Sequence, residues 1–178
     1  MENLENLNIT DFLFVTVPAL LVFFTAYTLI KKFIKNEEKN KLIETRRMLQ
    51  KEVLPLRLQA YERLTLFLER ISPNNLLIST YKPGMKAGRF QKELINKIRG
   101  EFEHNITQQI YMSSNAWQAV RTAKEETIKL IITASSSVNP EAPGLELSKG
   151  IFTKLTEMQE SPTQTAVNEM KKEILHLL

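Results

Sequence analysis

The run FLFVTVPALLVFFTAYTLI, from Phe12 to Ile30, decides how this chain of 178 residues is built. Its 19 residues carry no charge, and twelve of them are Phe, Leu, Val or Ile. As a helix the run is about 28 Å long at 1.5 Å per residue, close to the roughly 30 Å hydrocarbon core of a bilayer. Those twelve side chains favour insertion by about 4–7 kcal/mol. We therefore predict one transmembrane helix over residues 12–30, with the lipid bilayer as its partner.

Three other interpretations of this run are weaker. A buried core helix that is apolar on every side over 19 residues is long for a domain of this size. A cleaved signal peptide needs a basic start and a small-residue cleavage site, but Glu2, Glu5 and Asp11 make the start acidic and no A-x-A follows the run. A mitochondrial transit peptide is rich in Arg, and the first 30 residues contain neither Lys nor Arg.

The flanks of the run predict its orientation. Lys31, Lys32 and Lys35 follow it directly, whereas residues 1–11 form a short acidic tail. By the positive-inside rule, the tail is extracytoplasmic and the long C-terminal part is cytoplasmic. That part holds all 24 basic residues and 17 of the 20 acids, a net charge of 24 − 17 = +7.

Residues 31–53 read KKFIKNEEKNKLIETRRMLQKEV and predict a basic juxtamembrane helical stalk. They are mostly strong helix formers and contain neither Gly nor Pro. Their apolar residues are sparse, so the stalk is either a solvated spacer or one strand of a coiled coil. Pro55 is expected to end or kink this helix, because proline removes a backbone hydrogen bond and clashes with the preceding turn.

Residues 54–178 predict a cytoplasmic α-helical domain of four to six helices, and the whole chain is expected to be all-α. We expect Leu56–Ile71 and Leu94–Ile110 to form the centre of the core, because apolar residues recur there at helical spacing. Residues 116–137 and 151–158 carry further apolar stripes, the second made of Ile151, Phe152, Leu155 and Met158. The tetrapeptide Ser161-Pro162-Thr163-Gln164 has the pattern of a capping box at a helix start.

Composition and motifs exclude many chemistries. The chain has no Cys and two His, which removes thiol nucleophiles, cysteine-ligated metals and histidine-rich metal centres. It contains no phosphate-binding glycine loop, no H-E-x-x-H and no G-x-S-x-G. We expect no enzyme activity, no cofactor and no metal. Nucleic-acid binding is disfavoured because basic and acidic residues alternate outside 31–35 and 46–51.

Two groups of residues are candidates for recognition. The polar face of residues 55–71 is a candidate partner surface, since Arg is favoured at interfaces, but an ordinary solvated face explains it as well. Half-buried amides followed by aromatic residues form a candidate ligand cluster, although such amides also fix helix register. The first group is Arg57, Glu62, Arg63, Glu69 and Arg70, and the second is Asn105, Gln109, Tyr111 and Trp117.

Several long strings of this sequence resemble a small family of bacterial proteins that have one N-terminal span and a helical domain. The strings are PLRLQAYERL at 55–64, FLERISP at 67–73, EFEHN at 101–105, QQIY at 108–111, Trp117, Ala123-Lys124 and Ser161-Pro162. The resemblance covers the chain from end to end. It implies a bacterial inner (cytoplasmic) membrane location and an α-helical domain, and it supplies neither an activity nor a catalytic residue.

These features favour a membrane-anchored cytoplasmic helical interaction module, acting as a scaffold or assembly factor for a protein partner. The alternative is a membrane-tethered sensor whose helical domain binds a small ligand or lipid. Homo-oligomer formation and pairing of the stalk are left open.

Overall fold

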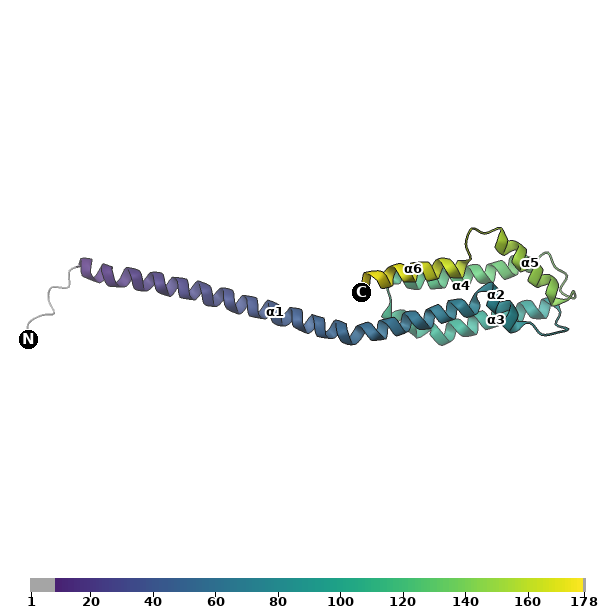
Figure 1. The fold of residues 1–178 in the computed structure, drawn as a ribbon, viewed down its shortest axis with the longest axis horizontal. Helices are drawn as coiled ribbons and strands as arrows, with labels where there is room; N and C mark the ends of the chain where they lie inside the picture. Colours follow the sequence, from purple (N-terminus) through teal and green to yellow (C-terminus); the bar gives the residue numbers. More distant parts are fainter. Residues whose placement is uncertain (1–8, 178) are drawn as a thin grey trace, which may run out of the picture. The chain divides into compact units, whose positions relative to one another are not determined.

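The computed structural model describes residues 9–177 as an all-α protein, which confirms the predicted fold class (Figure 1). Most of the predicted N-terminal tail lies outside these residues. No strand occurs between residues 9 and 177, and a single isolated bridge joins Lys86 and Pro143. The elements are α1 (Ile9–Ile71), α2 (Pro73–Thr80), α3 (Ala87–Asn105), the 3₁₀ helix η1 (Ile106–Tyr111), α4 (Ser114–Ser135), α5 (Gly144–Thr156) and α6 (Pro162–Leu177).

The chain divides into two compact units, residues 1–52 and 53–178. In the described part of the first unit, an 18-residue stretch of α1 beginning near Phe12 has a mean hydropathy of 2.2 and no buried residue. The hydroxyl of Thr16 donates to the carbonyl of Phe12 at 2.8 Å, which removes an unpaired donor from this apolar surface. The described residues therefore include one helix that is long and apolar enough to cross a membrane.

Of the two outcomes expected at Pro55, an end or a kink of the stalk helix, the end does not occur. Helix α1 continues through Pro55 to Ile71 and is 63 residues long. Proline costs the helix one backbone hydrogen bond and a steric adjustment, but the residues that follow bury a continuous apolar face. Packing of Ala60, Leu64 and Phe67, each at most 1% exposed, offsets that local cost.

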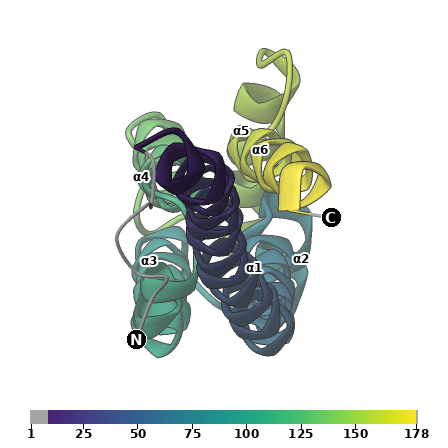
Figure 2. The ribbon, with the colours of Figure 1, turned by 90° about the vertical axis from the view of Figure 1, so that its left-hand side faces the viewer.

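The second unit has one hydrophobic core, to which every α-helix of residues 53–177 contributes, whereas η1 does not. Figure 2 shows these helices nearly end-on, and α4 packs against α6. The largest fully buried side chains are Tyr61, Phe67, Phe90, Leu64, Leu68, Ile71, Leu76, Leu94, Ile98, Ile131, Leu147 and Ile151. The expected centre of the core is thus confirmed from Ala60 to Ile71 and from Leu94 to Ile98.

The edges of the predicted core are wrong. Leu56 is 49% exposed. Helix α3 ends at Asn105, and the chain tightens into η1, so Ile106 and Ile110 leave the α-helical face and are 43% and 73% exposed. A 3₁₀ helix has three residues per turn instead of 3.6, so the spacing that predicted their burial does not hold there.

Helix α5 buries a narrower face than predicted. Ile151 is buried and Leu155 is half-buried, but Phe152 is 40% exposed. Met158 lies beyond the end of α5 at Thr156 and is also exposed. The predicted inward stripe is therefore correct at Ile151 and Leu155 and wrong at Phe152 and Met158.

The start of α6 follows the predicted capping box in one half only. The backbone N–H of Gln164 donates to the hydroxyl of Ser161 at 3.2 Å. The Gln164 side chain donates instead to Asn168 at 3.0 Å, so the reciprocal bond to Ser161 is replaced.

Two loops that are far apart in sequence are joined by backbone hydrogen bonds, which we call the loop clasp. Helix α3 begins without a side-chain cap, and its first N–H groups need acceptors. Ala87 donates to the carbonyl of Ala142 at 2.8 Å, and Gly88 donates to that of Pro140 at 2.9 Å. Gly144 returns a 2.8 Å bond to the carbonyl of Met85.

Candidate functional site

A half-buried carboxylate, that of Glu173 on α6, joins three elements of the domain. Its oxygens accept hydrogen bonds from the Tyr61 hydroxyl on α1 and from the Ser113 hydroxyl before α4. The Ser113 backbone N–H donates to Glu173 Oε1 at 3.1 Å. Arg57 lies 3.6 Å from the same oxygen and also donates to the carbonyl of Tyr111 at 3.0 Å. We call Arg57, Tyr61, Ser113 and Glu173 the Glu173 junction.

The Glu173 junction shifts the protonation equilibria of both its acids. Burial by itself raises the pKa of Glu173, but hydrogen bonds from Ser113 and Tyr61 and the charge of Arg57 outweigh it, so the pKa is lowered. Burial, followed by the hydrogen bond to Glu173, raises the pKa of Tyr61 to about 12. At neutral pH the Glu173 carboxylate is therefore ionised and the Tyr61 phenol is neutral. In these forms the phenol can donate its hydrogen bond and the carboxylate can accept it.

Glu173 is not among the predicted site residues, because nothing in the local sequence distinguishes it from its charged neighbours on the last helix. The one indirect signal is Tyr61, whose phenol lies on an otherwise apolar face and needs a partner when it is buried. Arg57, predicted on the partner surface, instead turns toward this junction.

The remaining residues of the candidate partner surface have mixed surroundings. Arg70 pairs with Glu101 on α3 at 3.1 Å, although its side chain is 63% exposed. Glu62, Arg63 and Glu69 are exposed, and within residues 9–177 no ion pair engages their side chains. Leu66, at helical spacing from all three, is 51% exposed. We call Glu62, Arg63, Leu66 and Glu69 the outer face of α1.

The candidate ligand cluster is not gathered into one site. Asn105 donates its side-chain amide to the carbonyl of Glu101 at 2.8 Å, at the end of α3. Gln109 is exposed, and Tyr111 contributes a carbonyl to Arg57. No hydrogen bond joins any two of Asn105, Gln109, Tyr111 and Trp117 in the described structure. The role of Asn105 in the structure is therefore local, at a helix terminus.

Trp117 belongs to an aromatic stack at the edge of the core. Its ring lies 5.4 Å from that of Phe102 at an interplanar angle of 25°, and Phe102 meets Phe67 at 5.9 Å. The ammonium of Lys124 lies 4.4 Å from the centroid of the Phe102 ring. These contacts are of the kind that stabilise a core, and they leave Trp117 half-buried.

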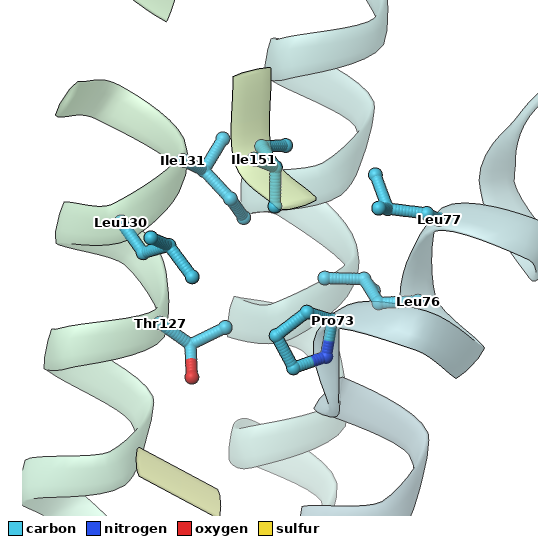
Figure 3. A pocket seen from close by; sticks show the side chains of 7 residues that line it. All are labelled: Pro73, Leu76, Leu77, Thr127, Leu130, Ile131 and Ile151. Atoms are coloured by element: carbon cyan, nitrogen blue, oxygen red, sulfur yellow. The ribbon is translucent and has the colours of Figure 1, made fainter. Parts of the chain in front are cut away.

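The apolar seam between α2, α4 and α5 offers no polar group to a ligand (Figure 3). It is lined by Pro73, Leu76, Leu77, Thr127, Leu130, Ile131 and Ile151. Thr127 has the one side-chain hydroxyl in this lining, and that hydroxyl donates to the carbonyl of Ala123 at 2.7 Å. Across the described residues, no three His, Cys, Asp or Glu side chains gather where they could hold a metal ion.

The model of the family described as "Family of unknown function (DUF7935)" matches residues 7–177. The chain belongs to this family. No curated protein and no solved structure matches the chain. The DUF7935 match includes both the apolar part of α1 and the helical domain, so the apolar helix belongs to the family's sequence pattern along with the domain.

Proposed function

We propose that this DUF7935 protein is a membrane-anchored, non-catalytic interaction module that holds a cytoplasmic protein partner at the bacterial inner membrane. The observation that carries the proposal is the outer face of α1. Three unpaired charged side chains surround an exposed leucine there, on a helix whose opposite face is fully buried in the core. A central apolar residue with a charged rim is the usual composition of a protein interface.

The charge pattern beside the apolar helix supports an orientation with the N-terminus outside. Lys31, Lys32 and Lys35 lie directly after the apolar run, and residues 1–30 have no basic residue. This asymmetry favours retention of the following domain in the cytoplasm. The anchored domain would then hold its bound partner at the bilayer, which raises the concentration of that partner at the membrane.

The experiment exchanges the charges of the outer face. Full-length protein with Glu62→Lys and Arg63→Glu is purified with an affinity tag from native membranes in mild detergent, and the co-purifying proteins are quantified by mass spectrometry. Both side chains are exposed, so the domain should stay folded. We expect a stoichiometric partner with the wild type and at least a tenfold loss of it with the variant.

The matched control exchanges an exposed pair on α5, through Glu146→Lys and Lys149→Glu. It keeps the net charge unchanged, as the test variant does, and should recover the partner like the wild type. Equal recovery with both variants would exclude the outer face of α1 as the interface. Recovery of no partner with the wild type would contradict the scaffold function itself.

A further inference from the structure

The stalk part of α1 carries large apolar side chains that no described residue covers. Leu42 and Leu49 are 54% and 56% exposed and lie seven residues apart. Val53 and Leu56 extend the same spacing at 44% and 49% exposure. The seven-residue spacing of Leu42 and Leu49 is that of successive d positions in a heptad. Val53 follows Leu49 by four residues, which is the spacing from d to the next a position.

With Leu42 and Leu49 at d, the charged residues of the stalk divide between the seam and the outer side of the helix. Lys35 takes a d position and Lys39 and Arg46 take a positions, whereas Glu37, Glu44 and Lys51 take the outermost f positions. Glu37 pairs with Lys41 at 3.0 Å on the outer side. The stalk thus has a short apolar stripe that basic residues interrupt, and a charged outer side, so it follows the coiled-coil pattern only in part.

The occupant that fits this stripe is a second copy of the same helix. Knobs-into-holes packing in a parallel pair places each d leucine against its equivalent, so a stripe of d leucines is complementary to itself. Lys39 takes an a position and Glu38 the preceding g position. Across a parallel pair, the Lys39 of one copy therefore lies beside the Glu38 of the other, which pairs opposite charges.

Arg46, also at an a position, decides the strength and the kind of pairing. A basic residue at a weakens the pair but favours a fixed parallel register, because its stem packs while its charge reaches the edge of the seam. A seam this short and interrupted gives little association in solution. Two copies anchored in one membrane share an orientation and a high local concentration. Both favour pairing and compensate for the weak association of the short seam.

We propose that the stalk pairs two copies of this protein in parallel along Leu42, Leu49 and Val53. The inference rests on the proposed membrane anchoring, since anchoring makes the two helices parallel and concentrates them. It extends the proposed function, because each assembly would then present two outer faces of α1 to its partners.

The absence of cysteine from the chain makes the test direct. Single substitutions Leu42→Cys and Leu49→Cys are introduced into the full-length protein in native membranes, which are oxidised mildly and analysed on non-reducing gels. Matched controls are Glu44→Cys and Lys51→Cys, at f positions on the outer side. We expect a reducible species of about twice 20.6 kDa, formed at least fivefold more with the d variants than with the f variants.

Three results would overturn the proposal. They are equal crosslinking at d and f positions, no crosslinking at any position, and a crosslinked species whose mass shows a different partner. Sedimentation of the same samples after carbonate extraction tests anchoring separately, so a monomer that stays in the membrane removes the pairing alone. As a second measurement, two differently tagged copies should co-purify, and Leu42→Glu with Leu49→Glu should reduce this recovery at least fivefold.

Discussion

At the scale of single residues, the Glu173 junction shows how a charge can be retained inside an all-α domain. A buried carboxylate is costly unless its oxygens are hydrogen-bonded and its charge is paired. Ser113, Tyr61 and Arg57 meet both needs. These partners come from the interior of α1 and from the N-cap of α4, so the junction fixes how α1, α4 and α6 meet.

Replacing Glu173 should destabilise the domain in a pH-dependent way. We expect Glu173→Gln to lower the free energy of unfolding by about 1–3 kcal/mol at pH 7. The folded-state pKa of Glu173 is lowered, so its contribution is present above the unfolded pKa of about 4.3 and is lost as pH falls through the folded value. The difference between wild type and variant should therefore shrink below about pH 5.

Denaturation of the full-length protein in detergent, followed by the fluorescence of Trp117, measures this difference. Trp117 is the one tryptophan of the chain and is stacked on Phe102 in the domain. Glu169→Gln is the control, because Glu169 lies on the exposed side of the same helix and pairs only with Lys172 in the described structure. A constant difference between pH 7 and pH 3 would show that the Glu173 carboxylate does not carry the effect.

Sequence reasoning could not separate Arg57 from the other charged residues of its helix. Arg57, Arg63 and Arg70 are alike in type and lie on the polar side of one amphipathic segment. Their surroundings differ because Tyr111 and Glu173 approach Arg57, Glu101 approaches Arg70, and no acid pairs with Arg63 in the described part of the chain. Those partners are 31 to 116 residues away along the chain, beyond the reach of local periodicity.

At the scale of elements, periodicity predicted the helices well and their ends less well. The stripe of α3 up to Ile98, the stripe of α4 and the Ser161 half of the α6 cap were correct, because apolar spacing and capping residues are local signals. The helix end expected at Pro55 as one of two outcomes does not occur, because the cost of a proline is local, whereas the packing gain that offsets it comes from residues 60–71. The change to a 3₁₀ helix after Asn105 has no comparable signal in the sequence.

Two glycines in different surroundings give a test of packing at this scale. An added Cβ at Gly144 would lie 2.9 Å from the carbonyl oxygen of Met85, a backbone atom that cannot move without breaking the loop clasp. An added Cβ at Gly100, inside α3, meets nothing within 4 Å. We expect Gly144→Ala to destabilise the domain by about 1–3 kcal/mol and Gly100→Ala to stabilise it by about 0.5–1 kcal/mol.

The same Trp117 fluorescence measurement compares these two variants with the wild type. Opposite signs are the informative result, because an alanine effect that was only a general helix propensity would be favourable at both sites. Stabilisation by Gly144→Ala would contradict the close approach between α5 and the loop before α3.

At the scale of the whole molecule, the proposed topology can be tested with the same cysteine-free background. Asn3→Cys and Asn115→Cys place one thiol in the tail and one in the domain. A membrane-impermeant maleimide should label Asn3→Cys in cells whose outer membrane is permeabilised, and should label Asn115→Cys only after the inner membrane is disrupted. The reverse pattern would place the domain outside the cytoplasm.

The sequence predicts the candidate span, the all-α class and the family resemblance because each depends on composition or on contiguous strings. It does not predict which charged residues are buried, since burial depends on the three-dimensional arrangement of helices. Only the structure therefore separates the candidate partner-surface residues that stay exposed from those that are engaged in contacts within the domain. Glu62, Arg63 and Glu69 stay exposed. Arg57 instead contacts Glu173 at the edge of the core, and Arg70 forms an ion pair with Glu101.

The loop clasp has a consequence for engineering the domain. Loops normally tolerate inserted sequence because few contacts depend on them. Here the loops around Met85 and Ala142 supply each other's hydrogen bonds, so lengthening either one removes acceptors from the first turn of α3. The connection from Glu157 to Glu160 is exposed and forms no such bonds with another loop. It is the place for an epitope tag, a fused reporter or the new termini of a circular permutant.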